Sequence, residues 1–144
     1  MDFTGKAALT AYGCAAASLF ILDIAWLRVV MGPMYRVELG EMIRAQPSLA
    51  PSLVFYLLYA IGVVVFAIVP GVDATSMSRA GFLGALLGLV AFATYDLSNL
   101  ANLKGWPLDL AMLDIAWGTF LTAAAAASAT AAVIAVSHET SVLR

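Results

Sequence analysis

The chain has 144 residues, of which 63% are hydrophobic and only 11% are charged, and its formal net charge is −2. A soluble domain has roughly half apolar and about a quarter charged residues, so the excess apolar surface of this chain must face lipid. The small negative charge gives no reason to expect nucleic acid as a partner, and the single cysteine, Cys14, excludes a disulfide within the chain.

The first of four apolar segments is expected to be a helix over residues 7–27, with Asp23 as its only charge. A bilayer core takes about 20 helical residues to cross, so this segment can span it. The following stretch, to residue 50, is polar and rich in Pro and Gly. Its apolar residues Met34, Val37 and Met42 fit either a short helix lying in the membrane interface or an irregular loop.

The three remaining segments are expected to be helices over residues 51–70, 80–103 and 108–136. Gly84 and Gly88 form a pair of small residues four apart, a pattern that predicts close approach of a second helix. The alanine-rich run at 122–132 is the expected partner surface.

No part of the sequence alternates with period two, and an isolated strand cannot satisfy its backbone inside a bilayer. The sequence therefore predicts an all-α integral membrane protein, with one domain over residues 1–144 and four transmembrane helices in an antiparallel bundle. Four spans place both termini on one side of the membrane. The basic residues are too evenly divided between the two sides to predict the orientation.

Carboxylates inside the spans are the sharpest functional signal, because charged groups are costly in hydrocarbon and mark functional sites by default. Asp23 and Asp96 lie near the C-terminal ends of the first and third helices, and Asp114 lies near the N-terminal end of the fourth. These ends share one membrane face in an antiparallel bundle. With a rise of about 1.5 Å per residue, the three carboxylates are expected at similar depth in one leaflet.

Other polar and aromatic residues fall on the same helix faces. Asp96 and Asn99 are three residues apart, and the pentapeptide LDIAW, at 22–26 and 113–117, twice places a Trp three residues after an Asp. The predicted ligand pocket consists of Asp23, Trp26, Tyr56, Tyr59, Tyr95, Asp96, Asn99, Asn102, Asp114 and Trp117. The candidates for catalytic groups are Asp23, Asp96, Asp114 and Tyr95.

Each of these groups also has a structural interpretation. The Asp side chains can form a hydrogen-bond network with Asn and Tyr that only holds the helices together. Tyr35 and Trp106 are typical of the aromatic belt at a membrane interface, and Asp109 is typical of the first turn of a helix.

Three carboxyl groups without a buried Lys or Arg cannot all stay ionised in a medium of low dielectric. Either some of them are protonated or a cation is bound, in which case Asp23, Asp96 and Asp114 would suit Mg²⁺ or Ca²⁺. No His or Cys stands at ligand spacing, so the sequence offers no support for zinc or haem, and it has no nucleotide-binding motif. Asp together with Tyr could perform acid–base chemistry on a lipid entering from the leaflet.

The blocks FYLLYAIG, YDLSNLANLKGWPL and LDIAWGTFLT carry a resemblance to a known family. The chain resembles the DUF2177 family of small predicted bacterial membrane proteins over about residues 11–125. The resemblance implies a four-helix protein of a bacterial inner membrane. It supplies no activity and no catalytic residues.

Three functions remain open from the sequence. The leading hypothesis is a membrane protein that binds, and in one version modifies, a lipid-like molecule at the carboxylate pocket. The second is a structural or accessory subunit of a larger membrane complex or homo-oligomer. The third is a proton- or cation-coupled carrier. The sequence leaves open whether the protein is an enzyme.

Overall fold

The computed structural model describes residues 5–42, 44, 46 and 48–142, and these form helices joined by short connections. The order along the chain is α1 (Gly5–Trp26), η1 (Leu27–Met31), α2 (Gly32–Glu38), η2 (Gly40–Met42), α3 (Leu49–Val63), η3 (Val64–Ile68), α4 (Val69–Asp73), α5 (Met77–Asn102) and α6 (Leu108–Val142). The elements η1 and η3 are single π-helical turns, and η2 is a 3₁₀ turn.

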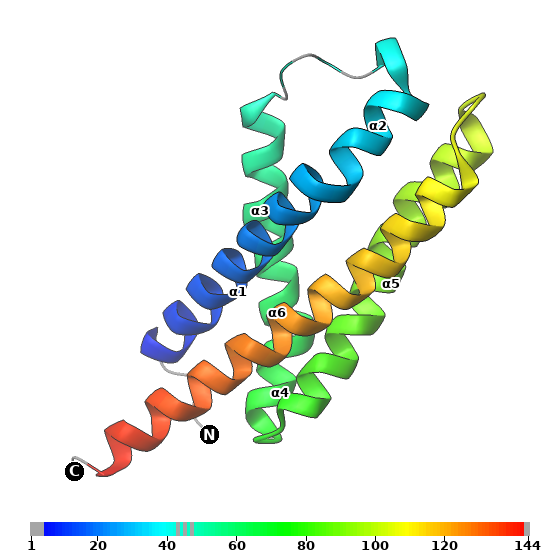
Figure 1. The fold of residues 1–144 in the computed structure, drawn as a ribbon. Coiled ribbons are helices and arrows are strands. Elements are labelled where there is room, and N and C mark those ends of the chain that lie inside the picture. Colours follow the sequence, from blue (N-terminus) through cyan, green and yellow to red (C-terminus); the bar gives the residue numbers. More distant parts are fainter. Residues whose placement is uncertain (1–4, 43, 45, 47, 143–144) are drawn as a thin grey trace.

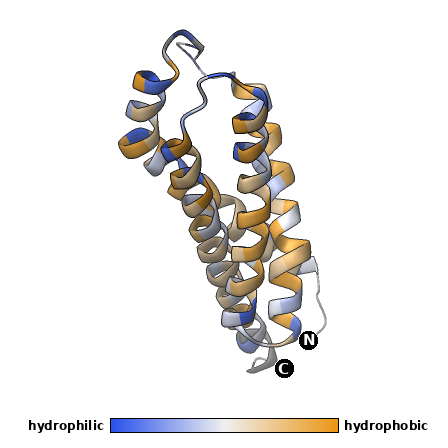
Figure 2. Cartoon of the chain, turned by 90° about the vertical axis from the view of Figure 1, so that its right-hand side faces the viewer, coloured by the Kyte–Doolittle hydropathy of each residue, from blue (hydrophilic) through white to orange (hydrophobic). Residues whose placement is uncertain are grey.

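Four continuous helical stretches are long and apolar enough to cross a membrane, and they are Gly5–Glu38, Leu49–Asp73, Met77–Asn102 and Leu108–His138. Figure 2 shows hydrophobic residues along most of their length, with hydrophilic residues gathered mainly toward the ends. The predicted fold class, an all-α bundle of four membrane-spanning helices, is confirmed.

The first span is longer than the sequence predicts, because α2 continues α1 to Glu38 instead of lying apart from it in the interface (Figure 1). Pro33 cannot donate a hydrogen bond, and in a regular helix its ring would clash with the carbonyl of Val29. The wide turn η1, in which the Gly32 N–H donates to the Leu27 carbonyl five residues earlier, relieves that clash. The helix therefore passes through the proline.

The second span also has a widened, π-helical turn before a proline. It was expected to end at Pro70, but η3 widens the turn that contains Phe66, whose carbonyl the proline ring would otherwise meet. The helix continues as α4 to Asp73. A proline inside an apolar segment is therefore a local widening in this protein and not a helix end.

The helices alternate in direction along the bundle (Figure 1). One end of the bundle carries the start of α1, the turn between α4 and α5, and the far end of α6. The other end, called here the loop end, carries the connection from α2 to α3 and the turn from α5 to α6. Helix α6 packs against both α1 and α5, so it forms the centre of the bundle.

The tightest contact in the bundle joins α5 to α6. A Cβ atom placed on Gly84 would lie 2.7 Å from the Thr122 carbonyl oxygen and 2.8 Å from the Ala126 Cβ. A Cβ on Gly88 would collide with the Gly118 carbonyl. The two backbones touch at these points, which confirms the close approach predicted from the small residues.

Near the loop end the packing is looser. Helix α5 packs against η3 and α4 of the second span but hardly against α3, which packs on α1 instead. Helices α1, α3, α5 and α6 therefore surround a space in this half of the bundle, and that space contains the candidate site.

Candidate functional site

The three carboxylates come from three helices. Asp23 lies in α1, Asp96 in α5 and Asp114 in α6. Asp114 lies close enough to both Asp96 and Asp23 for their charges to interact. Because the first helix continues to Glu38, Asp23 is not near the end of its helix as expected. It still lies close enough to Asp114 for the two charges to interact.

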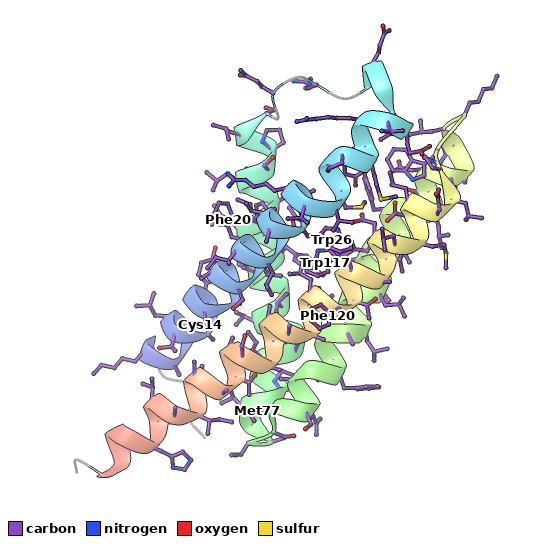
Figure 3. The ribbon with its side chains drawn as sticks, viewed as in Figure 1. Cys14, Phe20, Trp26, Met77, Trp117 and Phe120 are labelled. Atoms are coloured by element: carbon purple, nitrogen blue, oxygen red, sulfur yellow. The ribbon has the colours of Figure 1, made fainter. Side chains whose placement is uncertain are left out.

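Two donors from two other helices hold the Asp23 carboxylate. The Tyr56 hydroxyl in α3 donates to Oδ2 at 2.5 Å, and the Trp117 indole N–H in α6 donates to Oδ1 at 3.2 Å. The ring of Trp117 also stacks on Trp26, with centroids 4.4 Å apart and planes 6° apart, between α1 and α6 (Figure 3). The two LDIAW segments therefore meet. Each oxygen of the Asp23 carboxyl therefore accepts one hydrogen bond from a neighbouring helix.

Asp96 is in the opposite situation. Its side chain is 0% exposed, and neither of its oxygens has a hydrogen-bond partner among the described residues. It lies beside Asp114 and beside the Trp106 indole, whose N–H is also buried without a partner. A buried polar group without a partner is costly, so this unsatisfied carboxyl calls for a functional explanation. No Lys, Arg or His side chain is among the described residues that line the cavity beside these two acids, so the acids can share one proton.

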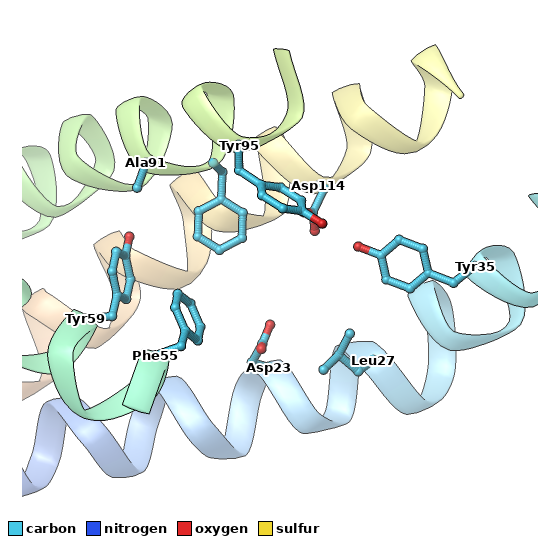
Figure 4. A pocket seen from close by; sticks show the side chains of 9 residues that line it. Asp23, Leu27, Tyr35, Phe55, Tyr59, Ala91, Tyr95 and Asp114 are labelled. Atoms are coloured by element: carbon cyan, nitrogen blue, oxygen red, sulfur yellow. The ribbon is translucent and has the colours of Figure 1, made fainter. Parts of the chain in front are cut away.

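A cavity of about 330 Å³ lies between Asp23 and Asp114 (Figure 4). Its lining residues are Asp23, Leu27, Tyr35, Phe55, Tyr59, Ala91, Phe92, Tyr95 and Asp114. The two carboxylates and the hydroxyls of Tyr35 and Tyr95 gather toward the loop end, and Tyr35 points toward Asp114 (Figure 4). The rings of Phe55, Tyr59 and Phe92 form the other end of the cavity. The cavity is therefore polar at one end and aromatic at the other.

The cavity reaches the outer surface of the bundle. Phe55 and Tyr95 both line it, yet their side chains are 47% and 52% exposed. They stand on α3 and α5, the two helices that hardly touch. These two exposed rings border the cavity on the side where α3 and α5 diverge, so the cavity is not enclosed there.

The Tyr59 hydroxyl is not free to meet a ligand. It bonds to the Thr122 hydroxyl at 2.8 Å, and that hydroxyl donates in turn to the Gly118 carbonyl at 2.7 Å, so Tyr59 is the donor. The Tyr59 ring packs edge-on to Phe92, with centroids 6.3 Å apart. Tyr59 therefore contributes an aromatic wall that is held in place by α6.

The structure distributes the predicted pocket residues over three positions. Asp23, Tyr59, Tyr95 and Asp114 line the cavity. Behind this lining lie Tyr56, Trp26 and Trp117 around Asp23, Asp96 behind Asp114, and Asn99 beside Tyr95. Asn102 lies outside the cavity. It is exposed and donates to the Ser98 carbonyl at 2.8 Å within its own helix.

Tyr35 and Trp106 are closer to the site than the belt interpretation predicted. Tyr35 lines the cavity, and Trp106 packs edge-on to Tyr95 with centroids 5.9 Å apart. A signal for Tyr35 was present in the sequence, because Asp23, Leu27 and Tyr35 stand at multiples of four residues. That signal has meaning only if the helix passes through Pro33. The apolar lining residues carried no signal, because lipid-facing positions are equally apolar.

The structure does not form the cation site that the sequence left open. Within the part of the chain that the structure describes, no three His, Cys, Asp or Glu side chains are grouped so that they could hold a metal ion. The three carboxylates are therefore divided into a pair, Asp96 with Asp114, and a separate Asp23 that is held by Tyr56 and Trp117.

Comparison with known proteins adds a family. A family model described as "Predicted membrane protein (DUF2177)" matches residues 8–131, which is most of the chain. No curated protein and no solved structure matches. The match carries no activity, so the chemistry of the cavity is the basis for a functional proposal.

Proposed function

The chain belongs to the DUF2177 family of predicted membrane proteins, and we propose that it binds an amphipathic, lipid-like molecule in the cavity between its four spans. One observation carries the proposal. The cavity is polar at one end and aromatic at the other, and it is not enclosed between Phe55 and Tyr95.

The direction of this gradient matches an amphipathic molecule lying in a leaflet. Tyr35 and Asp114 lie toward the loop end, and Tyr59 lies toward the middle of the bundle (Figure 4). A polar head would occupy the end with the carboxylates, and the first part of an alkyl chain would lie against the aromatic rings. The rest of the chain would leave through the opening between α3 and α5.

The volume of the cavity fits only part of a lipid-like molecule. Ligand sites typically have volumes of about 300–1,000 Å³, and this cavity, at about 330 Å³, is at the small end of that range. It can hold a head group and a short piece of chain but not a whole lipid. We therefore propose that the protein recognises the molecule by its head group, while the rest of the tail stays in the bilayer.

Modification of the bound molecule would need a group that gives or takes a proton. Asp114 is the candidate, because it faces the cavity while Asp96 lies behind it. The hydroxyls of Tyr35 and Tyr95 lie at the same polar end (Figure 4). In this version of the proposal the Asp96–Asp114 pair holds the proton.

The Asp23 network supports a second candidate, an accessory subunit of a larger membrane complex. The bonds from Tyr56 and Trp117 to Asp23 join α1, α3 and α6, which a purely structural role would also require. The carrier hypothesis has less support, because a pathway would have to continue through the tightly packed half of the bundle, where Ala11, Ala15 and Ala60 are fully buried.

The remaining features of the proposal concern location. We also propose that the protein lies in a bacterial inner membrane with both termini on the same side, which an even number of candidate spans supports.

A variant that fills the cavity tests the proposal. Ala91 lines the cavity, whereas Ala116 in α6 is exposed on the outer surface. The wild-type protein, Ala91→Phe and Ala116→Phe would be extracted in polymer-bounded native nanodiscs, and their bound small molecules compared by mass spectrometry. We expect an amphipathic species that is enriched with the wild type and with Ala116→Phe but lost from Ala91→Phe. Identical profiles for all three proteins would contradict the proposal.

A further inference from the structure

The charge of the cavity identifies the class of head group, provided that the proposed function is correct. We infer that the ligand carries a protonated amine, so that this is a site for a long-chain amine and not for a phospholipid phosphate or a fatty-acid carboxylate.

The lining of the cavity is acidic without compensation. Asp23 and Asp114 line it, Asp96 lies directly behind Asp114, and no Lys, Arg or His side chain is among the lining residues. An anionic head would meet two or three carboxyl groups inside a membrane, where charges are poorly screened. A cationic head would supply the counter-charge that the site lacks.

Hydrogen-bonding capacity points in the same direction. Asp23 already accepts from Tyr56 and Trp117, whereas Asp96 is fully buried with both oxygens unpartnered. The carboxyl that faces the cavity without such donors is that of Asp114, and the buried Asp96 lies behind it. An ammonium group brings one positive charge and three N–H donors, which is the complement of such a pair.

The arrangement of the side chains gives the ammonium a place. Tyr35 points toward Asp114 at the polar end, with Asp23 on the opposite wall (Figure 4). Donors on the head could reach the Asp114 carboxylate and the Tyr35 and Tyr95 hydroxyl oxygens. The aromatic rings of Phe55 and Phe92 then line the path of the first methylene groups, and ring faces also attract cations. A fatty alcohol could make one of these hydrogen bonds but would leave the charge unbalanced.

The experiment compares three probes that differ only in the head group. Dodecylamine, dodecanol and dodecanoic acid, each with a diazirine near the head, would be added at equal membrane concentration to the protein in phosphatidylcholine nanodiscs. Mildly alkaline buffer keeps the amine protonated and the acid ionised. Photolysis and peptide mapping then locate the labelled residues.

We expect the amine to label the cavity residues about tenfold more than the alcohol, which is the effect of about 1.4 kcal/mol on affinity, and the acid to label them least. Asp114→Asn should remove the preference for the amine. Asp109→Asn is the matched control, because Asp109 is exposed in the first turn of the same helix and should leave the preference intact.

The other outcomes are equally decisive. If the alcohol or the acid labels the cavity as strongly as the amine, the inference is overturned while the proposed function stands. If no probe labels the cavity, the proposed function itself fails. Amine labelling that is unchanged in Asp114→Asn would show attraction to the membrane alone.

Should Asp114→Asn fail to fold, Tyr35→Phe provides the test, because α2 packs mainly against its neighbours in the chain and the substitution removes only a hydroxyl.

Discussion

Two regions of this bundle show opposite solutions to packing helices in lipid. Along α5 and α6, Gly84, Gly88 and Gly118 bring the backbones into contact, and no space remains between them. Near the loop end, aromatic and acidic side chains keep α3 away from α5, and a cavity of about 330 Å³ is left between the helices. Small residues therefore pack α5 directly against α6, whereas large polar and aromatic residues line the cavity.

We expect the stability of the protein to depend mainly on the first region and the proposed binding on the second. The tightly packed half has mostly Ala, Val and Gly as its buried residues, and no carboxyl group is among them. The open half contains the carboxyl groups Asp23, Asp96 and Asp114, and burial of such groups is more costly than burial of the Thr130 hydroxyl in the other half. Three substitutions, described from the largest expected effect to the smallest, test this division.

The largest effect is expected from Gly88→Leu in the tight half. A side chain at this position would collide with the Gly118 carbonyl and lie 2.7 Å from the Thr122 hydroxyl. Overpacking of this kind costs about 1–3 kcal/mol or more of the free energy of unfolding, which can be measured by chemical denaturation in mild detergent. Gly81→Leu is the control, since a Cβ there would lie 3.6 Å from Ala127, an ordinary contact. Equal losses at both positions would show that the close approach has no energetic role.

An intermediate effect is expected from Asp23→Asn, at the border of the two regions. An amide has one acceptor oxygen in place of two, so either Tyr56 or Trp117 loses its partner. Hydrogen bonds to charged groups contribute about 1.5–3 kcal/mol, and those between membrane helices about 0.6 on average, so we expect a loss of about 1–2 kcal/mol. A shift in tryptophan emission should accompany it, because Trp117 is one of the donors. Wild-type stability together with unchanged emission would show that the two hydrogen bonds to Asp23 do not contribute to holding the helices together.

The smallest effect on stability is expected from the same substitution at Asp96, in the open half. An Asn amide can donate to Asp114 in place of the shared proton, so Asp96→Asn should change the free energy of unfolding by less than about 0.5 kcal/mol. Labelling of the cavity by the amine probe should nevertheless fall, because one of the three acids is removed. A large loss of stability would instead identify Asp96 as part of the structural network.

Parts of the site followed directly from the sequence. The rarity of acids in apolar segments identified Asp23, Asp96 and Asp114, and the repeated LDIAW indicated that Trp26 and Trp117 belong with two of them. Helix spacing also placed Asn99 beside the site. It placed Asn102 there as well, but Asn102 bonds to its own helix at the exposed surface. Spacing of three residues relates side chains along one helix and cannot tell how far that face extends toward a neighbouring helix.

Other parts could not be predicted because they depend on backbone detail. Tyr35 enters the cavity because η1 carries the helix through Pro33, and nothing local shows whether a proline will end a helix or widen a turn. Phe55 and Phe92 became lining residues because α3 diverges from α5, and an apolar residue facing a cavity is indistinguishable in sequence from one facing lipid.

The sequence by itself determined the properties that a bilayer requires of each segment separately, which are its apolar length and its low content of charge. The length of each apolar segment predicts four spans. The free-energy cost of placing charge in hydrocarbon indicates which residues have a structural or functional role. The tertiary structure alone decided which faces meet. It paired Asp96 with Asp114, gave Asp23 its two donors and left a cavity between them. Those outcomes depend on the rotation and divergence of whole helices, which are set by packing between distant segments and not by the composition of any one of them.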